Sequence, residues 1–105
     1  MIIELIEKNR MRIIALCKKH KVRQLFVFGS ILTDRFNENS DVDMVVDFDQ
    51  VTLEDYVDNY FNLKYSLQDL LGRKVDLLED KAIRNPILRR NIDNSKQLVY
   101  GGEEK

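Results

Sequence analysis

Three carboxylates and a Gly-Ser pair are the residues of this chain whose types and spacing could do chemistry. Asp41 and Asp43 stand two positions apart in a segment where apolar and polar residues alternate. Residues two apart on a strand point the same way, so both carboxylates are expected on one face, with Cα atoms roughly 6.5 Å apart. Carboxylate oxygens are the ligands that Mg²⁺ prefers, and two metal ions that share a phosphoryl substrate lie roughly 3.5–4 Å apart. The pair could therefore hold two magnesium ions.

The third carboxylate, Asp76, comes from a later segment that also reads as a strand, from Lys74 to Glu79. Val75 and Leu77 would lie on one face of that strand and Asp76 on the other. If the two strands are neighbours, Asp76 could bind the catalytic metal and help to remove the proton from an attacking hydroxyl.

Gly29 and Ser30 follow a continuous apolar run and could hold a phosphate. Glycine lets the backbone come close to a ligand. A helix that begins at Ser30 would direct free N–H groups at an anion, and the serine hydroxyl adds another donor. With the metal ions on the other side, these donors would hold a triphosphate.

Competing explanations of the same acids are weaker. Asn39, Asp41 and Asp43 copy the first three ligands of a calcium loop, but Met44 stands where that loop needs Gly and Gln50 where it needs Glu. No Cys/His set has zinc spacing, and no Walker-type sequence is present. Asp47 and Asp49 are interpreted as strand-exit residues rather than as ligands.

The elements that must position these residues follow from hydrophobic periodicity. Thr52 and Gly72 are expected to cap the longest helix, and Asn85-Pro86 to begin the last one. The predicted order is helix 2–19, strand 25–28, short helix 30–36, strand 41–48, helix 53–71, strand 74–79, helix 86–94 and an extended segment 96–100. This order predicts one α/β domain over residues 1–100, with a frayed tail at 101–105.

Length, composition and charge agree with one ordinary globular domain. The chain has 105 residues and a net charge of −1, which argues against a protein whose main task is to grip a nucleic-acid backbone. No apolar run approaches the roughly 20 residues needed to cross a bilayer, and the first residues do not resemble a signal peptide. A cytoplasmic location is therefore expected.

Several side chains that could suggest chemistry have a simpler structural interpretation. Cys17 lies on the apolar side of the first helix and is expected to pack as a small hydrophobe. His20 is expected to be a solvated residue at the end of that helix. Tyr56, Tyr60 and Phe61 recur at helical spacing and are expected in the core rather than as a base-stacking platform.

Gly29-Ser30, ten further residues and then Asp41-x-Asp43 resemble the signature of the DNA polymerase β-like nucleotidyltransferases. The run around Asp76 and the short length resemble the minimal, stand-alone branch of that superfamily, called MNT. The resemblance implies a mixed three-stranded sheet flanked by about four helices. It also implies magnesium-dependent transfer of a nucleoside monophosphate, commonly AMP from ATP, to a hydroxyl.

By the resemblance, Gly29 and Ser30 would hold the triphosphate, Asp41 and Asp43 would bind both metal ions, and Asp76 would be the third ligand and base. Members of this branch often act as antitoxins that modify a HEPN-domain toxin, so a HEPN partner and a hetero-oligomer are expected, with no direct nucleic-acid binding and no membrane.

The chain departs from the family pattern after Ser30. Many members continue with an Arg, Ala, Arg, Gly run, whereas this chain has Ile31, Leu32, Thr33 and Asp34. Arg35 is the candidate substitute for the missing cations. Three hypotheses therefore stay open: nucleotidyl transfer to a partner protein, a non-catalytic antitoxin that covers its partner, and nucleotidyl transfer to a small molecule.

Overall fold

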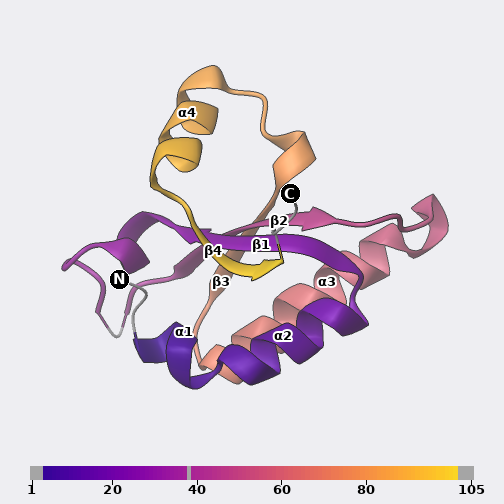
Figure 1. Cartoon of the computed structure of the whole chain (residues 1–105), viewed down its shortest axis with the longest axis horizontal. Helices are drawn as coiled ribbons and strands as arrows, with labels where there is room; N and C mark the ends of the chain where they lie inside the picture. Colours follow the sequence, from indigo (N-terminus) through magenta and orange to yellow (C-terminus); the bar gives the residue numbers. More distant parts are fainter. Residues whose placement is uncertain (1–3, 38, 102–105) are drawn as a thin grey trace.

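A computed structural model describes residues 4–37 and 39–101 (Figure 1). Two short 3-10 helices, η1 and η2, follow strands β1 and β3. The elements in chain order are α1 (Glu4–Lys8), α2 (Arg10–Lys19), β1 (Val22–Phe28), η1 (Gly29–Leu32), β2 (Val42–Phe48), α3 (Leu53–Leu71), β3 (Val75–Glu79), η2 (Asp80–Ala82), α4 (Pro86–Ser95) and β4 (Gln97–Gly101).

The sheet has four strands in the order β3-β2-β1-β4, not the three that the resemblance implied. Strand β1 is antiparallel to both β2 and β4, whereas β2 and β3 run parallel. The extra strand is the predicted extended segment at the end of the chain, which pairs with the far edge of β1. Gly101 ends this strand, and the rest of the predicted tail, 102–105, lies outside the described residues.

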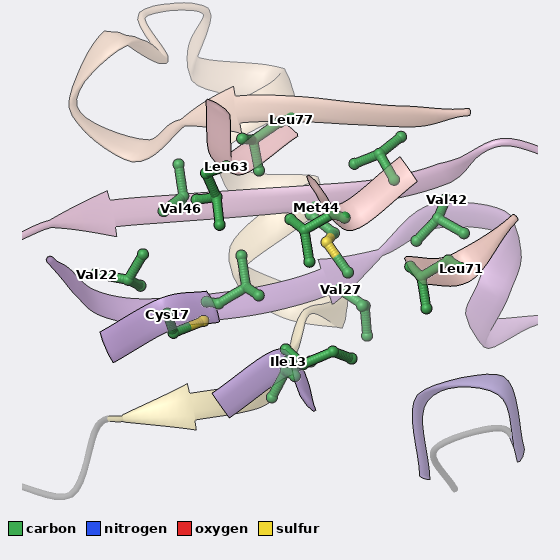
Figure 2. Close-up of a cluster of buried hydrophobic side chains, with 14 of the residues drawn as sticks. Ile13, Cys17, Val22, Val27, Val42, Met44, Val46, Leu63, Leu71 and Leu77 are labelled. Atoms are coloured by element: carbon green, nitrogen blue, oxygen red, sulfur yellow. The ribbon is translucent and has the colours of Figure 1, made fainter. Parts of the chain in front are cut away.

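Helices α2 and α3 cover one face of the sheet, and α4 lies on the other side (Figure 1). The main core lies between the sheet and the first two of these helices (Figure 2). Strand β2 alternates as predicted, with Val42, Met44 and Val46 fully buried in this core. Its odd-numbered residues therefore face the side of α4, and among them Val45 is also buried.

Cys17 is part of the core, as predicted, and burial raises the pKa of its thiol to about 12. A thiol with such a pKa stays protonated at neutral pH and is a poor nucleophile.

Helix α3 has the predicted caps at both ends. The Thr52 side chain accepts a hydrogen bond from the backbone N–H of Asp55, and Gly72 adopts the left-handed conformation with φ of 69°. At the start of α4, Asn85 accepts from the N–H groups of Ile87 and Leu88, with Pro86 in the first helical position. Local side-chain chemistry therefore sets these helix ends.

The predicted helix over 2–19 is two helices within the described residues, because the chain breaks at Asn9. The Asn9 side-chain amide donates to the carbonyl of Leu5, and its backbone N–H donates to that of Ile6. Asparagine side chains compete in this way with regular helical hydrogen bonds.

Two predictions about burial were wrong. His20 is only 6% exposed, and its polar groups have partners inside the protein: its Nδ1 lies 2.9 Å from the Leu16 carbonyl oxygen and its own carbonyl accepts from the Asn59 side chain. Phe61, expected in the core, is 40% exposed, and its neighbours at helical spacing, Leu53 and Val57, are more exposed still.

The outer strands of the sheet have helix side chains bonded to their backbones. On β3, the N–H of Val75 donates to Gln68 Oε1, and the Tyr60 hydroxyl donates to the carbonyl of Leu77. On β4, Arg10 Nη1 donates to the carbonyl of Val99 at 3.0 Å. No helix in the described part of the chain is long and apolar enough to span a bilayer.

Candidate active site

Asp43 and Asp76 are direct neighbours across the parallel β2–β3 pair. Paired residues of adjacent strands project from the same face, so both side chains lie on the face opposite the main core. Asp41 precedes β2 and is exposed. The structure therefore places Asp43 beside Asp76, whereas Asp41 lies two residues before Asp43 in the chain, close enough for its charge to affect the pKa of Asp43.

Gly29 lies against the carboxylate of Asp43. On the other side of β2, Asp43 pairs with Phe28, the residue just before Gly29. Gly29 has φ of 79°, and a Cβ atom there would collide with Asp43 Oδ2 and lie 3.3 Å from Asp43 Cγ. Only glycine fits this position, because any side chain would displace the carboxylate and strain the backbone.

The charges of these acids are not compensated by nearby cations. Burial, then the negative charges of Asp76 and Asp41, raise the pKa of Asp43 above its ordinary value. Within the described residues, none of the three carboxylates has an ion-pair partner within 4.0 Å. Such a group of carboxylates attracts cations.

A magnesium ion would fit this arrangement better than a metal that needs a closed protein cage. Across 4–37 and 39–101, no three Asp, Glu, His or Cys side chains converge into a ready-made metal site. Magnesium is usually bound by one or two carboxylates, with substrate phosphates and water as the other ligands. The oxygen-only donor set of Asp41, Asp43 and Asp76 meets that requirement.

The Gly-Ser segment forms the short helix η1 rather than the predicted helix 30–36. The carbonyl of Ser30 accepts from both the backbone N–H and the hydroxyl of Thr33, each at 2.9 Å. Ile31 is 1% exposed and belongs to the main core, and Leu32 packs against it. This chain therefore uses Ile31 and Leu32 for packing rather than as polar groups at the site.

Arg35 is exposed, and its backbone N–H donates to the Thr33 hydroxyl. No ion pair in the described part of the chain involves its guanidinium group. The structure thus shows no contact that links Arg35 to the three carboxylates.

Asp47 differs from Asp43 although both lie on the same face of β2. Lys81 Nζ is 3.8 Å from Asp47 Oδ1, and Arg23 Nε is 4.0 Å from Asp47 Oδ2. These cations compensate the carboxylate, which supports the interpretation of Asp47 as a structural residue at the strand end.

Sequence reasoning missed one residue beside the site. Arg73, in the turn between α3 and β3, donates from Nη1 to the carbonyls of Asn37 and Ser40. Those residues lie 36 and 33 positions away, and a lone arginine in a turn carries no pattern that would have indicated the contact.

The chain is similar to several known proteins. Residues 11–105 match the family model described as "Polymerase beta, Nucleotidyltransferase". A "Putative protein adenylyltransferase" of Methanocaldococcus jannaschii is 39% identical over 83 residues, which cover 79% of this chain and 80% of that protein.

Solved structures share the fold. A "putative minimal nucleotidyltransferase" superposes with a TM-score of 0.75 at 28% identity, over 92% of this chain and 95% of the other. A toxin-antitoxin with AMP-PNP superposes with a TM-score of 0.69 at 22% identity, over 90% of this chain and 75% of the other. A chain from the complex of tri-AMPylated Shewanella oneidensis HEPN toxin with MNT antitoxin superposes with a TM-score of 0.63 at 21% identity, over 92% of this chain and 73% of the other.

Proposed function

Because the chain belongs to the polymerase β nucleotidyltransferase family, we propose that it transfers AMP from ATP to a hydroxyl of a partner protein of the HEPN type, as the antitoxin of a toxin-antitoxin pair. The names of the relatives support the adenylyl group and the protein acceptor. The toxin-antitoxin complexes with the same fold support the kind of partner.

The observation that carries the proposal is the packing of Gly29 against Asp43, with Asp76 on the neighbouring strand. A glycine turn that could bind phosphate then lies beside carboxylates that have no ion-pair partner in the described part of the chain and could bind cations, which supports the proposal. A protein that only covered its partner would not require the two features to be in contact.

In the proposed reaction, the acceptor hydroxyl oxygen attacks the α-phosphorus of ATP, and the bond to the bridging oxygen breaks to release pyrophosphate. Asp41, Asp43 and Asp76 would hold two magnesium ions, and Asp76 would accept the hydroxyl proton. The backbone at Gly29 and the hydroxyl of Ser30 would bind phosphate oxygens. When bound, the ions would neutralise charge on the phosphates and lower the pKa of the attacking hydroxyl.

Transfer of label from ATP labelled at the α-phosphate tests the proposal. The protein is incubated with Mg²⁺, the labelled ATP and a HEPN-domain toxin protein encoded in the same genome. We expect labelled partner with the wild type and none with the Asp41→Asn, Asp43→Asn double variant. Asp49→Asn, which changes an exposed carboxylate that contacts Arg23, is the matched control and should retain transfer. Label that persists in the double variant would contradict the proposal.

A non-catalytic antitoxin is the second candidate, and the packing of Ile31 favours it. Ile31, which takes the place of an arginine in the family pattern described above, is buried in the main core. The nearest cation along the chain, Arg35, forms no ion pair with the carboxylates within the described residues. This candidate requires that the folded double variant still protects cells from the toxin, whereas the catalytic proposal requires that protection is lost.

A further inference from the structure

Arg73 joins the turn before β3 to the loop that leads into β2. Its Nη1 donates to the carbonyl of Asn37 at 2.8 Å and to that of Ser40 at 2.9 Å. Its guanidinium carbon lies 4.5 Å from the centre of the Phe36 ring, within the range of a cation–π contact. One arginine therefore binds the loop at three points.

Phe36 of this loop also packs against the main core, and the other hydrogen bonds of its described residues join close neighbours in the chain. The N–H of Asn37 donates to the Ser40 hydroxyl, and the N–H of Asn39 donates to the Asn37 side chain. The N–H of Ser40 donates to the carbonyl of Asn37. These bonds shape the loop locally, whereas the Arg73 bonds and the packing of Phe36 join it to the rest of the fold.

Asp41 lies at the end of the sheet, outside the strand pairing that holds Asp43 opposite Asp76, because β2 begins at Val42. On its C-terminal side it is held by the Val42 N–H, which donates to the Lys74 carbonyl at 3.0 Å. The residue before it, Ser40, is the one that Arg73 holds through its carbonyl.

We propose that Arg73 is a positioning residue that holds Asp41 in the geometry required for metal binding, by fixing the loop through Asn37 and Ser40. The inference rests on the proposed function, because it assigns a purpose to the position of Asp41.

Lysine should replace Arg73 only in part. A lysine ammonium can reach one carbonyl, but it lacks the planar guanidinium group that bonds to both carbonyls and stacks on the Phe36 ring. A role that depends on the guanidinium geometry therefore predicts an intermediate phenotype for Arg73→Lys.

The test compares Arg73→Ala, Arg73→Lys and Arg12→Ala, the last being a matched loss of an exposed arginine on α2. In Arg73→Ala, we expect amide hydrogen exchange at Ser40 to accelerate by about tenfold or more, as loss of a charge-assisted hydrogen bond predicts. We also expect Mn²⁺ affinity without nucleotide and kcat for transfer to fall by about tenfold or more, with exchange in β1 unchanged. Arg73→Lys should recover part of the affinity, and Arg12→Ala should match the wild type.

Unchanged exchange at Ser40 in Arg73→Ala would overturn the inference. So would faster exchange with wild-type Mn²⁺ affinity and kcat, because Arg73 would then be merely structural. A wild-type protein that binds no Mn²⁺ and transfers no label would contradict the proposed function instead, and faster exchange at Ser40 would still support the loop-holding role of Arg73.

Discussion

Asp43 is paired with Asp76 across two parallel strands, and no cation within the described residues forms an ion pair with either. Burial and the two neighbouring carboxylates raise the pKa of Asp43. The folded protein therefore holds negative charge here at a cost in stability, as active sites often do.

The first prediction concerns the pH dependence of stability. The pKa of Asp43 is higher in the folded than in the unfolded state. As the pH falls, Asp43 is therefore protonated first in the folded protein, and the cost of its negative charge to stability disappears. Asp43→Asn should therefore be more stable than the wild type at pH 7, by roughly 0.5–2 kcal/mol.

This advantage should shrink as the pH drops through the raised pKa of Asp43. Urea unfolding of both proteins between pH 7 and pH 4 measures the difference, with the exposed Asp58→Asn as control. An advantage that stays constant with pH would contradict the assignment of the cost to this carboxylate.

Divalent cations should stabilise the wild type. A ligand that binds only the folded state at a hundred times its dissociation constant adds about 2.7 kcal/mol to the free energy of unfolding. We expect Mg²⁺ or Mn²⁺ to raise the thermal midpoint, EDTA to reverse the shift, and the Asp41→Asn, Asp43→Asn double variant to show none. An equal shift in the double variant would place the binding elsewhere.

Gly29 and Gly72 provide a matched pair for testing close packing at the site. Both have positive φ, but a Cβ at Gly29 would meet the Asp43 carboxylate, whereas one at Gly72 would meet nothing within 4 Å. Gly29→Ala should lose about 1–3 kcal/mol of stability and abolish transfer, because Asp43 must move.

Gly72→Ala should lose about 1–2 kcal/mol from its backbone alone and should retain transfer. Chemical unfolding and the labelled-ATP assay separate the two effects. Equal loss of transfer activity in Gly29→Ala and Gly72→Ala would mean that the contact between residue 29 and Asp43 does not determine activity.

Helix α3 offers a contrast between buried and exposed leucines. Leu67 is fully buried, so Leu67→Ala should lose about 2–5 kcal/mol of unfolding free energy. Leu53 is 89% exposed, and Leu53→Ala should change stability by less than about 0.5 kcal/mol. Urea midpoints measure both, and a similar loss in the two variants would contradict the observed packing.

The elements predicted well are those whose signals are local. The alternation in β2 is visible because one face of the strand is buried and the other polar, and the ends of α3 and α4 depend on capping side chains within a few residues. The meeting of Asp43 with Asp76 required only that two recognised strands be neighbours.

The features that were missed depend on distant parts of the chain. The segment 96–100 was predicted to be extended, but its place as a fourth strand depends on pairing with β1, which its own residues do not indicate. The His20 carbonyl bonds to Asn59 of another helix, and the bonds of Arg73 cross more than 30 residues of chain. Hydrophobic periodicity identifies one apolar face of a helix, but it cannot say how much of that face a small sheet covers, as Phe61 shows.

The helix side chains bonded to the outer strands have a consequence for assembly. Gln68 and Tyr60 occupy backbone groups of β3, and Arg10 occupies a carbonyl of β4. A strand from another molecule would have to displace these side chains before it could extend the sheet. These side chains therefore oppose both edge-to-edge aggregation and partner binding by strand addition. Complexes of this domain are thus expected to form through side-chain surfaces, and the sheet should keep its four strands.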